Sequence, residues 1–480
     1  MGKTIRSHVV LKPGSQVTDV FGGGSQADVT ESANITAEST SQAQNIYGGS
    51  NSSGTVTNPV VTLKGTAVNA YGAGKGSGTI TSTPQINAED GAAVTFLYGG
   101  GEQGQTTDGA AVNLKNGSHV TNTFGGGNAA GVAGTSAVTM ESGAAADKIY
   151  GGSNSSGSVT STEITVSGAV GTAEVAGAVY GAGLGKETST GNTKVTLEST
   201  GVIYGEIFGG GAEGPVTGDT AVLLKASSKT NGNVYAGGDA AVVAGNSELS
   251  ANDGSVIVGT LFGGGKGSTA NIGKDTRVIA FAHVTGNIFG GGAEGAVTGS
   301  THVDIAKGLV DGDGITTGNV FGGSDKAKVK GNTKVHIGWE AAEGTGTAVD
   351  GVTLVIKGTV FGGGNTTDNG NTFDASDPFV LGDASVSVDA SGYAKDDFNI
   401  EKSILGDGNM CTVKGSRTIS IKNYEALGTQ SNTSIQRADT VTLDHSKVEL
   451  SGATDSANLV PTVAYSLNRI DDINVTDNTS

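Results

Sequence analysis

Histidines and carboxylates are the side chains of this sequence that could carry out catalysis or hold a metal. The six histidines show neither the His-x-x-x-His spacing nor the pairing with cysteine that is typical of zinc sites; they are His8, His119, His283, His302, His336 and His445. Glu213 and Glu294 occupy equivalent positions in two copies of a repeat, and stacking would hold them about 14 Å apart. The two carboxylates of a glycosidase lie only ~5 to 9.5 Å apart, so the sequence predicts a protein that is not an enzyme.

Two short acidic loops resemble calcium loops in composition. They are residues 311–314 (Asp-Gly-Asp-Gly) and residues 407–409 (Asp-Gly-Asn). Neither shows the twelve-residue ligand spacing of a calcium-binding loop, and the nonapeptide of calcium-binding β-rolls is absent. We therefore expect no cofactor, with calcium as the remaining candidate. Cys411 is the only cysteine, which excludes an internal disulfide, and we expect it to act as a small buried hydrophobic residue.

Thirteen aromatic residues share one sequence context and form the candidate ligand-binding site. Each follows an aliphatic residue, or in two copies Ala or Thr, and precedes a glycine-rich triplet, as in Val20-Phe21-Gly22-Gly23-Gly24. Rings exposed along a surface could bind sugars, whereas rings stacked over a glycine shelf would need no ligand. The packing role is favoured and the ligand-facing role stays open. The thirteen residues, called the aromatic ladder, are Phe21, Tyr47, Tyr71, Tyr98, Phe124, Tyr150, Tyr180, Phe208, Tyr235, Phe262, Phe289, Phe321 and Phe361.

The elements that position these rings are indicated by the spacing of the motif. It returns every 24 to 40 residues, most often after 26 or 27, which indicates one structural unit stacked on itself. Glycine makes up 83 of the 480 residues, about 17% against the usual ~7%. These glycines recur at fixed offsets from the aliphatic and aromatic positions, and a disordered linker would have no need of such spacing. We therefore predict one elongated repeat body.

Apolar residues alternate with a period of two, as in residues 193–197 and 333–337, and this predicts β-strands. The copy between Phe208 and Tyr235 contains three such runs, separated by glycine or polar turns. The predicted fold is all-β: a right-handed parallel β-helix (β-solenoid) with about 13–14 coils of ~27 residues and three short strands per coil. In such a stack, equivalent residues of successive coils lie about 4.8 Å apart.

Three further columns of equivalent residues follow from this stacking. The aliphatic residue before each aromatic should face the core, where each contributes about 1.5 to 3 kcal/mol. The triplet glycines should allow a positive φ and a close approach of neighbouring coils. Threonines after Gly-Asx or Gly-Ser, such as Thr193, Thr301 and Thr333, should form hydrogen bonds along the solenoid axis.

The repeat pattern loosens near residue 410. We predict glycine-rich β-solenoid repeats in residues 1–410, and in residues 411–480 either a degenerate continuation of the solenoid or a cap over its last strand edge. Residues 405–408 (Leu-Gly-Asp-Gly) look like a degenerate copy of the motif. Residues 437–450 still alternate with a period of two.

Charge and termini restrict the partners. The formal net charge of −18 argues against nucleic acid and anionic membranes as partners. No stretch of about 18 apolar residues could span a bilayer. The first residues lack the apolar core of a secretory signal, and the chain stops at Ser480 with no anchor. We therefore expect the sequence, if secreted, to be a fragment of a longer protein.

The motif Val360-Phe361-Gly362-Gly363-Gly364-Asn365, with Gly-Asn-Thr-x-Val between copies, resembles the repeats of large cell-surface proteins of gut bacteria. The tail, with residues 434–439 and 451–455, is similar to those proteins too, many of which are anchored in Gram-positive cell walls. The resemblance covers nearly the whole chain. It implies an extracellular, surface-exposed adhesin or host-interacting fibre, with host glycans or proteins such as mucin or immunoglobulin as partners.

Two alternative functions can be distinguished from the adhesin by experiment. A phage tail fibre or spike also uses β-helices, and trimerisation in solution would favour it. A polysaccharide-cleaving β-helix enzyme would need clustered aspartates with Arg or Lys on one strand face, and would turn over a polysaccharide. The sequence favours the non-catalytic adhesin.

Overall fold

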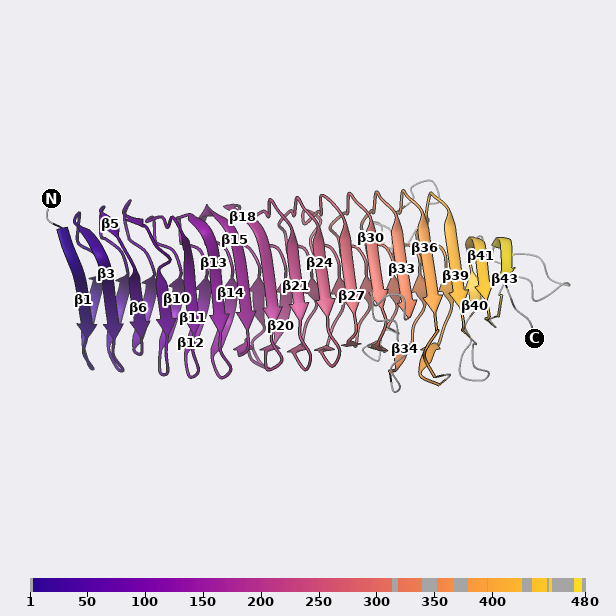
Figure 1. The fold of residues 1–480 in the computed structure, drawn as a ribbon, viewed down its shortest axis with the longest axis horizontal. Helices are drawn as coiled ribbons and strands as arrows, with labels where there is room; N and C mark the ends of the chain where they lie inside the picture. The colour runs from indigo at the N-terminus through magenta and orange to yellow at the C-terminus, as the bar shows by residue number, and fades with distance from the viewer. Residues whose placement is uncertain are drawn as a thin grey trace. The chain divides into compact units, whose positions relative to one another are not determined.

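The computed structural model describes residues 3–312, 318–338, 352–365, 379–394, 396–424, 434–446, 449–450 and 470–476. The regular elements of this part are β-strands, so it contains no helix that could cross a membrane. Residue contacts divide the chain into unit 1 (Met1–Gly232 and Gly237–Gly245) and unit 2 (Asn233–Ala236 and Asn246–Ser480). Each unit is a parallel β-solenoid with a spacing of about 27 residues per turn, and the two together have about 15 turns (Figure 1). The predicted fold class is confirmed.

Each turn of unit 1 contributes to two parallel sheets, A and B. Sheet A of unit 1 contains β1 (Lys3–Leu11), β3 (Asp28–Ala37), β5 (Thr55–Val56), β6 (Pro59–Leu63), β8 (Thr79–Ile80), β9 (Gln85–Ala88), β11 (Gly109–Leu114), β13 (Val132–Met140), β15 (Ser156–Val166), β18 (Glu187–Leu197) and β21 (Thr220–Leu224). Sheet B of unit 1 contains β2 (Gln16–Phe21), β4 (Gln42–Tyr47), β7 (Thr66–Tyr71), β10 (Ala93–Tyr98), β12 (His119–Phe124), β14 (Ala145–Tyr150), β16 (Ala169–Val170), β17 (Gly177–Tyr180), β19 (Val202–Ile203), β20 (Gly205–Phe208) and β22 (Lys229–Thr230).

Unit 2 repeats this arrangement with shorter sheet B strands. Sheet A of unit 2 contains β24 (Ser247–Ala251), β27 (Thr276–Ala280), β30 (Thr301–Ile305), β33 (Thr333–Gly338), β36 (Ala384–Asp389), β39 (Arg417–Lys422), β41 (Ala438–Asp444) and β43 (Ile470–Thr476). Sheet B of unit 2 contains β23 (Val234–Tyr235), β25 (Val256–Ile257), β26 (Leu261–Phe262), β28 (His283–Val284), β29 (Ile288–Phe289), β31 (Gly308–Val310), β32 (Val320–Phe321), β34 (Leu354–Ile356), β35 (Val360–Phe361), β37 (Phe398–Ile400), β38 (Ile404–Leu405), β40 (Ser434–Gln436) and β42 (Glu449–Leu450).

The third side of each turn is formed by short parallel pairings, such as β5 with β8 and the first four residues of β15 with those of β18, and by single-residue bridges. In unit 1, Ile80, Thr106 and Val132 form parallel bridges from one turn to the next. In unit 2 the corresponding series links Ile272, Val297, Val329, Val380 and Val413. These side chains are buried and close the core on this side. The third strand expected in each coil is therefore short in unit 1, and in this series of unit 2 it is a single paired residue.

The aliphatic column lies in the core of both units. In unit 1 each residue of the column pairs with its equivalent one turn away, as in Ile149 with Val179 and Val179 with Ile207. In unit 2 the same holds from Val234 to Ile435. Nearly all of these side chains are inaccessible to solvent, so each contributes the full ~1.5 to 3 kcal/mol of a buried aliphatic residue. The predicted register of the motif is confirmed.

The triplet glycines are required by close packing. A Cβ atom added at Gly181 would lie 2.0 Å from the carbonyl oxygen of Gly209, and one at Gly263 would lie 2.1 Å from that of Gly290. Both clashes involve backbone atoms, which cannot move without breaking the strand pairing. The φ angles of the triplet glycines lie outside the left-handed region. The expectation of a positive φ is therefore wrong, whereas the expectation of a close approach is confirmed.

The threonine column satisfies the backbone at the glycine turn. Thr193 Oγ1 donates a hydrogen bond to the carbonyl oxygen of Gly209 over 2.6 Å, and Thr301 and Thr333 bond to Gly322 and Gly362 in the same way. These hydroxyls are buried. They bond to the carbonyl oxygens of the glycine turns rather than to one another. A side-chain hydroxyl is what this position uses, because Ser136 and Ser247 stand in the same column and donate the same kind of hydrogen bond to Gly151 and Gly263.

Asparagine and aspartate side chains support the turns of unit 2. The Oδ1 atom of Asn319 accepts a hydrogen bond from the backbone N–H of Thr359 over 2.8 Å, and Asn287 supports Asn319 equivalently. A second column of such side chains lies beside sheet A, where Asn332 Oδ1 accepts a hydrogen bond from the backbone N–H of Asp383. Each side chain caps the backbone of the next turn, which explains the Gly-Asn pairs of the repeat.

The later part of unit 2 keeps the same pairing. Leu405 pairs with Phe361 and so stands at the next position of the aromatic ladder. Strands β39, β41 and β43 then continue sheet A in parallel. Cys411 is buried, and burial raises the pKa of its thiol to about 12. Residues 313–314 and 451–455, which we singled out in the sequence, lie outside the described residues.

Candidate ligand-binding site

The aromatic ladder is a continuous stack of parallel rings in each unit. In unit 1, from Phe21 to Phe208, neighbouring ring centroids are 4.7 to 5.0 Å apart and the ring planes are within 13° of parallel. In unit 2, from Tyr235 to Phe361, the centroids are 4.6 to 5.1 Å apart and the planes within 4°. The distance between paired strands sets this spacing, because each ring stands on a strand of sheet B. The stack is a direct result of the in-register pairing.

The rings lie beneath the surface. All of them except Phe21 and Tyr180 are buried, and these two are partly buried. Residues that follow the glycine triplets pack against the ladder in unit 1, among them Leu184 and Ala212. The ring faces are covered by their neighbours in the stack, so the geometry favours the packing role. Ligand binding by the ladder stays a prediction, because eleven of its thirteen rings are buried.

The tyrosine hydroxyls at the edge of the ladder have polar partners. Tyr47 donates a hydrogen bond to Glu102 Oε2 over 2.6 Å, and the amide of Asn154 donates to the Tyr98 hydroxyl oxygen over 3.3 Å. Burial raises the pKa of Tyr98 to about 12 and, assisted by Glu102, raises the pKa of Tyr47 further. The stack thus accepts Phe or Tyr, because a polar group lies at its edge.

An open groove crosses the outer face of sheet B in unit 1. It has a volume of about 580 Å³ and spans β2, β4, β7 and β10. In-register pairing places Gln16, Gln42 and Thr66 side by side along one row. The exposed side chains that line the groove are Gln16, Thr18, Gln42, Gln44, Thr66, Val68, Ala93 and Thr95.

The chemistry of this groove is neutral and polar. Its lining consists of amide, hydroxyl and methyl groups and includes no charged side chain. Amides both donate and accept hydrogen bonds, and hydroxyls do the same, so the surface suits a ligand rich in hydroxyl or amide groups. The sequence analysis missed the groove because its residues alternate with core residues on ordinary strands and share no motif.

A second, smaller hollow in unit 2 is lined by aromatic rings. It has a volume of about 270 Å³. Phe398 lies 4.9 Å from Tyr393 and 5.4 Å from Tyr424 between ring centroids, with both pairs edge to face. Tyr393 donates a hydrogen bond to the carbonyl oxygen of Ala306, which fixes this ring to another turn. Aromatic rings beside the exposed amide of Asn423 could hold a small apolar or sugar-like group.

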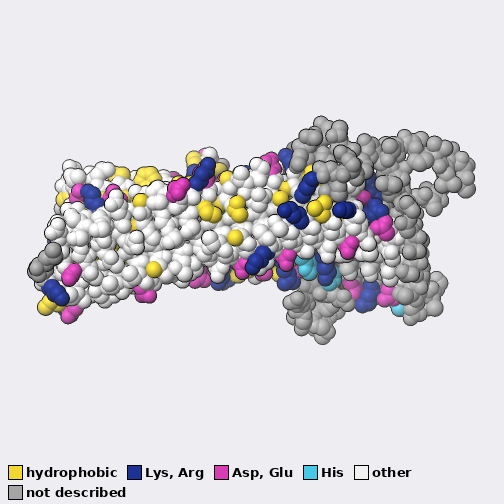
Figure 2. Space-filling model, turned by 90° about the horizontal axis from the view of Figure 1, so that it is seen from above, with side chains coloured by type: hydrophobic (Ala, Val, Ile, Leu, Met, Phe, Trp, Pro, Cys, Tyr) yellow, Lys and Arg dark blue, Asp and Glu magenta, His cyan; other side chains and the backbone are white. Residues whose placement is uncertain are grey.

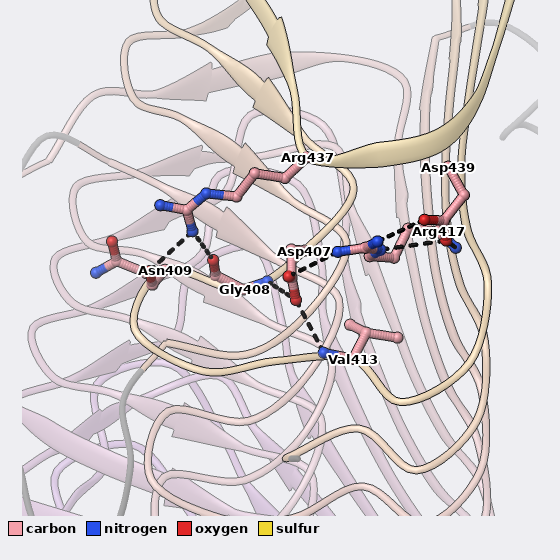
Figure 3. Close-up of polar contacts among 7 residues, drawn as sticks. All are labelled: Asp407, Gly408, Asn409, Val413, Arg417, Arg437 and Asp439. Carbon is pink, nitrogen blue, oxygen red and sulfur yellow. Dashed lines mark hydrogen bonds and ion pairs between the residues drawn. The ribbon is translucent and has the colours of Figure 1, made fainter. Parts of the chain in front are cut away.

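The acidic loop at Asp407 contains a buried network of charged groups instead of a calcium site (Figure 3). Oδ1 of Asp407 accepts hydrogen bonds from the N–H groups of Gly408 and Val413, and Oδ2 lies 3.2 Å from Arg417 Nη1. Arg437 donates to the carbonyl oxygens of Gly408 and Asn409. The oxygens that could bind calcium are therefore already bonded to N–H donors and guanidinium groups. This arrangement does not fit calcium at this loop.

Most other candidate residues stand apart from one another. Glu213 in unit 1 and Glu294 in unit 2 are exposed on turns. His119 pairs with Asp147 and His283 with Asp311, each over 3.1 Å. Figure 2 shows charged side chains of both signs scattered over a face made mostly of uncharged polar groups and backbone.

Comparison of the chain with protein-family models, curated proteins and solved structures gives no match.

Proposed function

We propose that this chain is a non-catalytic, ligand-binding part of a bacterial cell-surface adhesin, and that it binds host glycans or glycosylated host proteins such as mucin or immunoglobulin. The observation that carries the proposal is the neutral groove over β2, β4, β7 and β10. Its exposed glutamines and threonines offer hydrogen bonds in rows. Rows of such groups on a rigid sheet suit a long, hydroxyl-rich ligand.

The construction of the solenoid also supports this role. Each turn is held by the aromatic ladder, the aliphatic column and backbone pairing, so the outer side chains can vary without loss of the core. The net charge of −18 disfavours binding driven by phosphate groups. Recognition through neutral hydrogen-bonding groups is the mode that this surface favours.

The test is a binding screen with the purified chain against a glycan panel, mucin and serum immunoglobulins. The double variant Gln16→Ala/Gln42→Ala removes two neighbouring amides of the groove. Gln85→Ala is the matched control, because Gln85 is an exposed glutamine on β9 of sheet A, outside the groove. We expect the double variant to lower the affinity for the ligand found by at least about tenfold, corresponding to loss of one or two hydrogen bonds, and the control to bind as the native chain does.

Equal binding by the native chain and the double variant would remove the groove from the proposal. Failure to bind any member of the panel would contradict the adhesin itself. A stable trimer in solution, together with binding to bacterial envelope polysaccharide, would favour a phage tail fibre instead. Turnover of a polysaccharide would favour an enzyme.

A further inference from the structure

Three side chains with metal-binding atoms converge on sheet A of unit 2. They are His302 and Asp304 on β30 and His336 on β33. Asp304 pairs in register with His336, and His302 stands two residues before Asp304 on the same face of its strand. His302 Nε2 lies 2.9 Å from Asp304 Oδ1, and His336 Nδ1 lies 3.8 Å from the same oxygen. The three candidate ligand atoms all lie within 4.8 Å of one another.

The spacing of these atoms fits a single small ion. Zinc binds imidazole nitrogen and carboxylate oxygen at about 2.0 to 2.2 Å, so two tetrahedral ligands lie about 3.3 to 3.6 Å apart. The observed separations of 2.9 and 3.8 Å bracket this value. Two imidazoles and one carboxylate form a ligand set that suits zinc and related divalent transition metals better than calcium or magnesium, which prefer oxygen.

The surroundings orient the carboxylate. The Asp304 side chain is only 2% exposed, and its second oxygen, Oδ2, lies 3.0 Å from Arg277 Nε. This contact turns Oδ1 toward the imidazoles, as a hydrogen-bonded neighbour does for the carboxylates of metal sites. Burial raises the pKa of Asp304, but the contacts with His302 and Arg277 outweigh burial and hold that pKa below its usual value. The carboxylate is therefore ionised at neutral pH.

The partial exposure of the two histidines gives a metal ion access to the cluster. The side chain of His302 is 31% exposed and that of His336 is 10% exposed, so the cluster is open on the His302 side. Lys334, which pairs with His302 across the strands, is exposed to solvent. Ser387 on β36 pairs with His336 and brings no charge. Arg277 and Lys334, the register partners of His302 on the two neighbouring strands, are cations beside the cluster.

We propose that His302, Asp304 and His336 bind one divalent transition-metal ion of the zinc class, which joins β30 to β33. Three protein ligands leave one coordination position, which a water molecule or a ligand group can fill on the open side. The ion links two successive turns of unit 2 and stabilises their pairing. The proposal is independent of the groove in unit 1.

The test uses the full chain, free of any affinity tag and stripped with a chelator. Zinc is titrated calorimetrically, and cobalt is titrated as a spectroscopic probe of the ligands. We expect one ion per chain and a higher melting temperature with zinc. His302→Ala, His336→Ala and Asp304→Asn should each lower the affinity at least about tenfold, as loss of a ligand requires. His283→Ala is the matched control, since His283 also pairs with an aspartate in unit 2 but lies outside the cluster.

Far-UV circular dichroism shows whether each variant is folded. Should Asp304→Asn unfold because its site is buried, His302→Ala still decides the question, as that side chain is the most exposed of the three. Affinity should also fall as the solution is acidified, because protons compete with the metal ion for its ligands. The absence of stoichiometric binding by the native chain, or native affinity in both histidine variants, would overturn the proposal and leave a network of ion pairs only.

Discussion

The substitution Phe124→Ala tests the aromatic ladder most severely. The Phe124 side chain is 1% exposed, and its ring lies between those of Tyr98 and Tyr150, with centroids 5.0 and 4.8 Å away. Replacing a buried phenylalanine with alanine costs about 3 to 5 kcal/mol. Two stacked ring pairs account for about 1 to 3 kcal/mol of this cost. We expect unit 1 to lose about 4 kcal/mol, or about 8 to 16 °C in melting temperature for a unit of this size.

Urea and thermal unfolding followed by circular dichroism would measure the loss, with hydrogen exchange locating it along the chain. Phe96→Ala provides the control, because Phe96 is only partly buried and its ring lies farther from that of Tyr98, at 6.5 Å between centroids. Exchange should increase most in β10, β12 and β14, which carry the three stacked rings. A loss for Phe124→Ala no larger than that for Phe96→Ala would refute the reasoning.

Two further predictions concern buried hydroxyl groups. Thr301→Val keeps the shape of the side chain but removes the hydrogen bond to Gly322, so urea unfolding should show a loss of about 1 to 3 kcal/mol, and Thr301→Ser should be milder. Burial raises the pKa of Tyr98 and of Tyr150 to about 12, against ~10 in an unfolded chain. Their contribution to stability is thus complete below about pH 10 and is lost as the pH rises toward 12. The tyrosinate absorbance lost in the variant Tyr98→Phe/Tyr150→Phe should therefore be the part that appears late, together with the loss of circular dichroism. Its appearance at about pH 10 in a folded chain would contradict the burial.

The sequence was sufficient to predict the stacked strands. Residues such as Ile149 and Val179 recur at one offset from the aromatic residues, and a parallel stack is the arrangement that buries all of them at once. The same periodicity predicted that Leu405 would stand in the position of an aromatic residue. Periodicity fixes which residues lie over one another, so it determines the register.

Periodicity does not reveal what lies beside a column. The rings are covered by residues such as Leu184 and Ala212, whose types change from turn to turn, so their burial gave no repeating signal. The hydroxyl of Thr193 donates a hydrogen bond to the carbonyl oxygen of Gly209, 16 residues later in the chain. Only the shape of the turn specifies this contact.

The metal cluster, too, could not be predicted from the sequence. His302 and His336 are separated by 34 residues, and they meet because one turn of unit 2 places β33 beside β30. Spacing rules for metal ligands assume a single helix or a short loop, and they fail when the ligands come from stacked strands. The groove was missed for a related reason, since Gln16 and Gln42 belong to different turns.

Parallel, in-register pairing of equivalent residues is the central claim, and a cysteine cross-link tests it most directly. Ala93 and His119 are exposed register partners on β10 and β12, so their Cα atoms should lie about 4.8 Å apart, within the range of a disulfide. In a Cys411→Ala background, the pair Ala93→Cys/His119→Cys should oxidise rapidly to an intramolecular disulfide, detected as a mass loss of about 2 Da. The pair Ala93→Cys/Thr121→Cys, two residues out of register and so more than ~7 Å apart, should remain reduced. Equal or faster cross-linking of the second pair would contradict the stacked solenoid.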